Sequence, residues 1–248
     1  MRRIVYAAAG LMLILFASSV AAQTADELVK KAIEAQGGRK NILAIKTLKM
    51  TGKVLAQQGV EFPFTIYEKR PMKMRMESTI QGQTMVQAYD GEKAWWIMPF
   101  MGSTEPQLVP EEQAKDIKEQ ADFDGPLFDY KKKGNKVEYL GKEEVEGTDA
   151  YKLKVTLKNG SIRYVYLDAE YYLPIKVVTK RKRKDTEITV ETYQGDYKKV
   201  AGVLMPHSIE SRMNGKTVSQ ITIEKVEPNI PLDDSLFVMP KKTEKGGK

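Results

Sequence analysis

The sequence predicts a mainly β protein with a few helices, in which one curled antiparallel sheet of about eleven strands forms an incomplete, half-open β-barrel. Three observations predict this class. Short runs of alternating apolar residues fill most of the chain, Gly, Asn and Asp turns separate them, and helical patterns occur only at the start and in the middle. So many strands favour a sheet that bends toward a barrel, with the helices covering its concave face.

Composition limits the chemistry. The chain has 248 residues, of which 42% are hydrophobic and 29% charged, so it is long enough to fold around a substantial core. It contains no Cys and one His, which excludes disulfides, thiolate nucleophiles, Cys-ligated zinc and a multi-histidine metal site within one chain. No Ser occupies a nucleophile elbow, and His207 is expected to be a structural or a surface histidine. We therefore predict a protein that is not an enzyme and that uses no metal or cofactor.

Residues 1–22 have the pattern of a secretory signal peptide. Arg2 and Arg3 precede an apolar run that is too short to span a membrane comfortably, and small residues lead to a cleavage site near Ala22. The alternative is an uncleaved anchor. Export of a chain without Cys favours the periplasm. One domain is expected over residues 23–240, followed by a basic, disordered tail at 241–248.

The domain is predicted to open with a helix. Thr24 and Glu27 form a capping-box pattern, and Gly37 with Gly38 ends the helical stretch. Its apolar stripe should lie on a larger body, and residues 39–45 suit a short second helical turn.

Strands follow, and short connections favour a meander order. The clearest case is the run 151–157, where apolar residues alternate with Lys and Thr before an Asn-Gly hairpin turn at 159–160. The predicted strands lie at 48–56, 60–69, 72–80, 84–89, 94–98, 136–145, 151–157, 162–167, 174–180, 186–197, 205–213 and 217–226.

One insertion interrupts the strands. Pro110 and the acids after it predict the first turn of a helix that runs to about Gln120. Residues 122–130 then read as a loop because they surround a Gly-Pro pair with aromatic side chains. The helices could act as lids over the concave face, or they could simply fill the core of the sheet.

A stripe of Met and Phe gives the most specific clue to a binding site. With a period of two, its members share one face: Phe62, Phe64, Ile66, Met72, Met74 and Met76. Flexible Met side chains suit a cavity for acyl chains of variable shape, although an ordinary packed core would give the same pattern.

Five consecutive basic residues, Lys180 to Lys184, lie between two predicted strands. A solvated hairpin tip explains them, and contact with anionic lipid headgroups or an acidic partner is the alternative. Nucleic acid is a poor candidate for the partner of an exported protein.

Several short motifs, taken in order, resemble one family. They are the Lys-Arg-Pro step at 69–71, the Met-bearing strand after it, the passage Asp-Gly-Glu-Lys-Ala-Trp-Trp at 90–96 and the closing segment Leu-Phe-Val-Met-Pro at 236–240. Together they resemble the periplasmic lipoprotein-sorting carriers of the LolA-like superfamily, over nearly the whole mature chain. The long Lys-rich hairpins and the basic tail depart from that pattern.

The resemblance implies a monomeric carrier whose half-open barrel holds the acyl chains of lipoproteins or other lipids. Its partners would be an inner-membrane lipoprotein exporter and an outer-membrane acceptor. Arg70 would control the lid by hydrogen-bonding lid carbonyls, whereas without the family likeness it reads as a surface Arg. Trp95 and Trp96 are adjacent, so only one can face the cavity, and Trp95 is counted among the cavity residues. A periplasmic sensor of lipid or mislocalised lipoprotein, a carrier of other lipids and a structural envelope protein are the alternatives.

Overall fold

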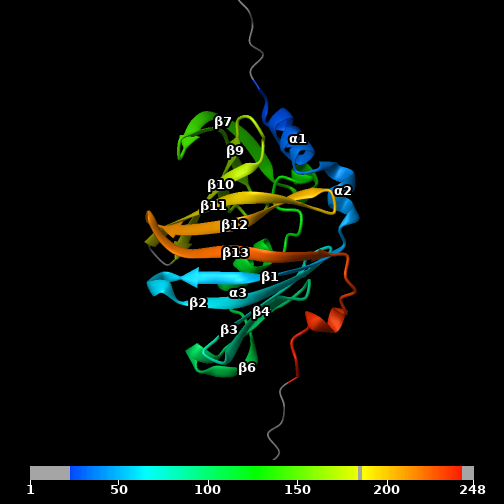
Figure 1. The fold of residues 1–248 in the computed structure, drawn as a ribbon, viewed down its shortest axis with the longest axis vertical. Helices are drawn as coiled ribbons and strands as arrows, with labels where there is room; N and C mark the ends of the chain where they lie inside the picture. Colours follow the sequence, from blue (N-terminus) through cyan, green and yellow to red (C-terminus); the bar gives the residue numbers. More distant parts are fainter. Residues whose placement is uncertain (1–22, 184–185, 242–248) are drawn as a thin grey trace, which may run out of the picture.

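The computed structural model describes residues 23–183 and 186–241 and is mainly β (Figure 1). It contains one antiparallel sheet of 13 strands and four helices. The predicted signal peptide, Lys184 in the basic run and residues 242–248 of the predicted tail lie outside the described residues. The helices are α1 (Ala25–Ala35), α2 (Gly38–Ala44), α3 (Glu111–Gln120) and α4 (Tyr130–Lys133).

The strands confirm most of the predicted runs. They are β1 (Thr47–Ala56), β2 (Glu61–Lys69), β3 (Lys73–Ile80), β4 (Gln83–Tyr89), β5 (Ala94–Met98), β6 (Ser103–Leu108), β7 (Lys136–Val145), β8 (Thr148–Thr156), β9 (Ile162–Asp168), β10 (Pro174–Arg183), β11 (Thr186–Val200), β12 (Val203–Met213) and β13 (Lys216–Pro228). Strand β6 was not predicted from the sequence, because its residues STEPQL include a Pro and few strand-forming residues. Such a sequence is tolerated here because β6 is an edge strand.

The strand order departs from a single meander. Strands β1 to β6 and β7 to β13 each follow chain order, but β1 pairs with β13 and joins the two halves. The edge strands are therefore β6 and β7, at the bottom and top of Figure 1, and the chain between them forms α3 and α4. Because β6 and β7 do not pair, the sheet is open. It is neither closed nor strongly curled, which corrects the expected half-open barrel of about eleven strands.

The first helix forms as its sequence predicts. Thr24 and Glu27 make both hydrogen bonds of a capping box, and Leu28 is fully buried against β8 and β9. Gly37 links α1 to α2 at φ +125°, and a Cβ there would lie 2.1 Å from the Gly202 carbonyl oxygen. Only Gly allows this close approach, so it fixes how α1 and α2 meet the β11–β12 turn.

Helix α3 lies across the same face of the sheet. Ile117 packs in the cluster around Met74 on β3, while Glu119 accepts hydrogen bonds from Arg163 on β9 and from Asn159 in the β8–β9 turn. Although burial raises the pKa of Glu119, these hydrogen bonds leave it below its usual value. Helix α3 thus contacts both β4 and β9. These two strands are far apart in the sheet order, with β3, β2, β1, β13, β12, β11 and β10 between them.

Candidate functional site

The strand register places the predicted apolar stripe on the face that the helices cover, here called the helix-bearing face. Directly paired residues of antiparallel strands point to the same side, and Ile66 pairs with Met50 on β1 and Met76 on β3. Phe64 pairs with Gly52, and Met74 pairs with Glu68, in the same alternation. This register confirms that the stripe members within β2 and β3 share one face, while Met72 precedes β3 and packs against the same cluster as Met74.

The members of the stripe differ in how completely they are buried. Phe64 and Met74 are buried, Phe64 beside Val54 and Ile223, and Met74 beneath α3. Phe62, Ile66, Met72 and Met76 are only partly buried and pack at the edges of these two clusters.

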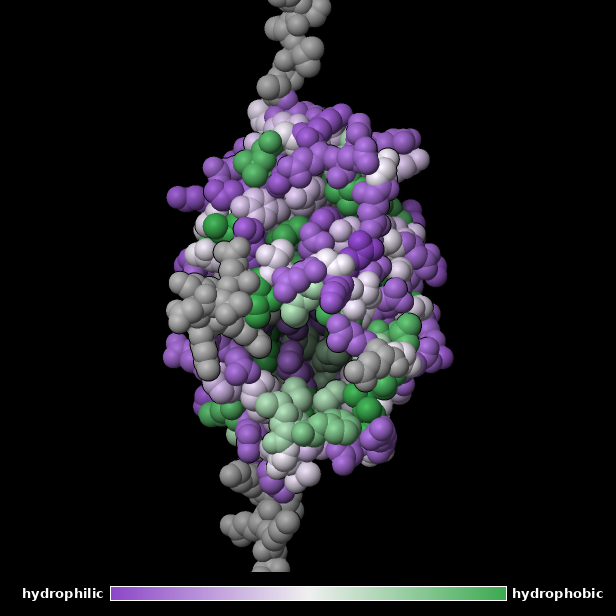
Figure 2. All heavy atoms as spheres, turned by 90° about the vertical axis from the view of Figure 1, so that its left-hand side faces the viewer, coloured by the Kyte–Doolittle hydropathy of each residue, from purple (hydrophilic) through white to green (hydrophobic). Residues whose placement is uncertain are grey.

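Figure 2 shows a hollow in the molecule, viewed from the left of Figure 1, with moderately hydrophobic side chains along its lower rim. Partial burial on a helix-covered face leaves apolar surface that a chain-like ligand could cover.

Trp95 is the one predicted cavity residue that the structure moves elsewhere. Its partner across the β4–β5 pair is Ala88, which belongs to the opposite face of the sheet. There Trp95 is fully buried, with the Arg75 guanidinium over its ring and its indole N–H donating to the Phe237 carbonyl oxygen at 2.7 Å. The expectation that Trp95 lines the cavity is therefore wrong. Trp96 packs against the Met74 cluster instead.

Trp95→Phe is expected to lower the free energy of unfolding by about 1–3 kcal/mol, because the buried Phe237 carbonyl loses its donor. Chemical denaturation measures this. The matched change Trp96→Phe should cost less, since Trp96 is only partly buried and no such indole hydrogen bond anchors it to the C-terminal segment. Equal losses would contradict an anchoring role for Trp95.

Arg70 lies between the sheet and the segments that cover it. Its Nε donates to the Ile45 carbonyl oxygen at 2.6 Å and its Nη2 to that of Ile42 at 2.8 Å, so it holds the C-terminal end of α2. Both terminal nitrogens also contact the Asp124 carboxylate, and the guanidinium lies 4.4 Å from the centre of the Phe123 ring. Arg70 thus joins α2 to the loop after α3.

Glu68 is an acidic side chain of the helix-bearing face that interacts electrostatically with Arg70 and Asp124. It lies between Leu48 on β1 and Met74 on β3, and it keeps some accessible surface although protein surrounds it on most sides. Burial raises the pKa of the Glu68 carboxyl to about 7; the positive charge of Arg70 opposes the rise, and Asp124 adds to it. Glu68 therefore places a titratable group beside the Arg70 contact.

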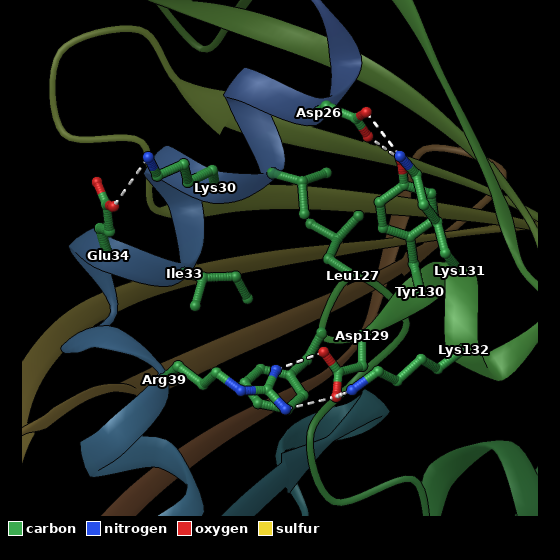
Figure 3. A pocket seen from close by; sticks show the side chains of 12 residues that line it. Asp26, Lys30, Ile33, Glu34, Arg39, Leu127, Asp129, Tyr130, Lys131 and Lys132 are labelled. Carbon is green, nitrogen blue, oxygen red and sulfur yellow. Dashed lines mark hydrogen bonds and ion pairs between the residues drawn. The ribbon is translucent and has the colours of Figure 1, made fainter.

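A second cavity, of about 530 Å³, lies between α1 and the segment that leads into α4 (Figure 3). Its floor is apolar, with Ile33 and Leu127, while charged side chains form its rim. The rim charges are paired. Lys131 and Tyr130 donate to the Asp26 carboxylate and hold the pKa of Asp26 below its usual value. None of the binding or lid residues predicted from the sequence lines this cavity, because the segment around Leu127 has no periodic pattern.

Over 23–183 and 186–241 no three His, Cys, Asp or Glu side chains gather into a group that could hold a metal ion. His207 is buried in β12, with Nδ1 3.0 Å from the Met205 carbonyl oxygen. In the part of the chain that the structure describes, no helix is long and apolar enough to cross a membrane.

An open antiparallel sheet with helices packed on one face defines a class of fold, and solved structures share it. One is a LolA superfamily protein from Nitrosomonas europaea, with 15% identity, a TM-score of 0.60 and coverage of 88% of this chain and 98% of that one. A DUF1329 family protein from Desulfovibrio piger has 13% identity, a TM-score of 0.59 and coverage of 86% and 97%.

A third match names the sorting proteins directly. It is a putative outer membrane lipoprotein-sorting protein domain from Vibrio parahaemolyticus, with 13% identity, a TM-score of 0.53 and coverage of 84% of this chain and 97% of that one. No protein-family model and no curated protein sequence matches the chain. The chain therefore has the LolA-like fold, and the resemblance seen in its motifs is confirmed at the level of fold.

Proposed function

We propose that this protein is a periplasmic carrier that takes up acyl chains on its helix-bearing face and moves lipoproteins, or other lipids, toward the outer membrane. The observation that carries the proposal is the set of partly buried apolar side chains on this face, including Phe62, Ile66 and Met76. Each methylene group that leaves water there stabilises the complex by about 0.8 kcal/mol. The LolA-like fold supports the same role.

The contact made by Arg70 suits a carrier because carriage must be reversible. The guanidinium holds α2 and the loop after α3 over the face through hydrogen bonds that a ligand could displace. In this role Arg70 controls the lid, an inner-membrane exporter delivers the cargo, and an outer-membrane acceptor receives it. The carrier acts as a monomer, and no covalent step is required.

Native mass spectrometry of protein isolated from a periplasm tests the proposal. We expect an adduct with the mass of a lipid or an acylated peptide, released on harsher activation. Met76→Glu should remove most of the adduct, because it places a charge where the acyl chain would lie. The matched control is Thr79→Glu on the same strand, whose side chain is exposed on the opposite face. It should keep the adduct.

Thermal unfolding of both variants confirms that they fold. A wild-type protein that stays bare after incubation with membranes bearing lipoproteins would contradict the proposed function. An adduct that Met76→Glu and Thr79→Glu affect equally would contradict its placement on the helix-bearing face.

A further inference from the structure

Exposed apolar side chains gather at one end of the sheet. Nine large hydrophobic residues are exposed in the described part of the chain, and five of them lie at or next to the tips of three hairpins. We call these five the apolar tips: Leu55 and Val60 at the β1–β2 hairpin, Phe100 and Met101 at the β5–β6 hairpin, and Met213 at the β12–β13 hairpin. The other four are scattered along the chain.

The three hairpins point the same way. Because Ala56 pairs with Ser219, the β1–β2 and β12–β13 tips lie at the same end of the sheet. Antiparallel pairing from β2 through β6 brings the β3–β4 and β5–β6 tips to this end as well. In Figure 1 this is the left end, and Figure 2, viewed from that side, shows the hollow opening here.

Two of these three tips, and the β3–β4 turn between them, also lack charge in a chain of which 29% is charged. Residues 55–60, 80–84 and 97–103 contain no Asp, Glu, Lys or Arg. Met101 is 75% exposed and Phe100 is 50% exposed, so both project into solvent. Clustered exposure of this kind on a folded domain marks a contact surface.

We propose that the apolar tips dock the protein on a lipid bilayer, with Phe100 and Met101 entering the interfacial region. The four neighbouring hairpins from β6 to β12 form a row of eight strands, roughly 34 Å long at the usual strand spacing. Projecting tips suit a soft interface that they can penetrate, whereas a protein partner would require a continuous, complementary patch. Lys216 beside Met213 is exposed and suits an anionic headgroup.

Docking on a bilayer extends the proposed function. It depends on that function only for its biological purpose, which is the transfer of acyl chains. Docking at this end brings the mouth of the hollow to the bilayer surface, so that an acyl chain could pass between membrane and protein with little exposure to water. Contact with a bilayer is measurable without cargo.

Flotation with vesicles of phosphatidylethanolamine and phosphatidylglycerol tests the docking. The double variant Phe100→Ser/Met101→Ser should partition onto vesicles at least about tenfold more weakly than wild type, because two apolar side chains no longer leave water. The control is Leu108→Ser, which changes an exposed residue at the opposite end of the same hairpin and should partition like wild type.

A second measurement follows the tip itself. The emission of Phe100→Trp should shift to the blue and be quenched by brominated lipids, whereas Leu108→Trp should show neither change. Equal flotation of the double variant and wild type would overturn the docking, as would equal losses in the double variant and Leu108→Ser. A dimer that forms without vesicles and disappears in the double variant, while no form floats, would instead assign the tips to self-association.

The two proposals fail separately. Wild-type protein that carries a lipid adduct but floats independently of the tips refutes the docking and leaves the carrier role. Protein that floats through its tips but never carries an adduct supports the docking and refutes the carrier role.

Discussion

Arg70→Leu is expected to lower the free energy of unfolding by about 3–5 kcal/mol, the usual cost of removing one partner from a buried ion pair. The side chains of Arg70 and Asp124 are only 16% and 14% exposed, so the substitution leaves the Asp124 carboxylate without its cation. The carbonyls of Ile42 and Ile45 also lose their donors. Urea denaturation at constant pH measures the change.

The same variant separates loading from release. If Arg70 returns the lid to its closed position, the variant should still load an acylated cargo but transfer it more slowly to an acceptor. Transfer at the wild-type rate would show that Arg70 does not control the lid.

Arg39→Leu is the matched control for stability. Arg39 also donates two hydrogen bonds to an aspartate of the loop after α3, Asp129. The Arg39 side chain, however, is 51% exposed. An exposed pair of this kind contributes little, so Arg39→Leu should lower the free energy of unfolding much less than Arg70→Leu does. A loss for Arg39→Leu as large as that for Arg70→Leu would mean that burial does not set the strength of the Arg70 contact.

Glu68→Gln is expected to stabilise the protein at pH 8 by about 3 kcal/mol and to change little at pH 4.5. The pKa of Glu68 rises from 4.5 to about 7 on folding, so the folded state binds more protons between these values. The contribution of Glu68 to stability is therefore complete below about pH 4.5 and is lost as the pH rises through 7. Gln keeps the shape of the neutral acid without this loss.

Denaturation midpoints across this pH range test the prediction, with Glu224→Gln as the control. Glu224 lies on β13 with an exposed side chain, so its substitution should change the free energy of unfolding little. A Glu68→Gln profile parallel to that of wild type would show that folding does not raise the pKa of the Glu68 carboxyl.

Local patterns predicted the parts of this fold that local interactions determine. The capping box of α1 needs only Thr24 and Glu27, and both form the expected hydrogen bonds. The alternation of Phe64, Ile66 and Met74 required only the geometry of a strand, and the register confirms it. Pro110 and the acids after it correctly predicted the start of α3.

Features set by distant segments were beyond these patterns. The pairing of β1 with β13 depends on both halves of the chain, and it makes β6 and β7 the edge strands. Trp95 was misplaced because the C-terminal segment covers its face, and the choice between two adjacent Trp residues cannot be read from alternation alone. The partners of Arg70 come from α2 and from the loop after α3, which no strand pattern connects.

Photocrosslinking with a fatty acid that carries a diazirine at its chain end tests whether acyl chains bind to the helix-bearing face. After loading and irradiation, fragmentation of the modified peptides locates the label. If acyl chains bind there, we expect labels on Phe62, Ile66 and Met76 of the helix-bearing face, and labelling that falls when unlabelled lipid competes. Labels confined to Ile33 and Leu127 in the cavity beneath α1, or to side chains of the opposite face, would contradict binding at this face.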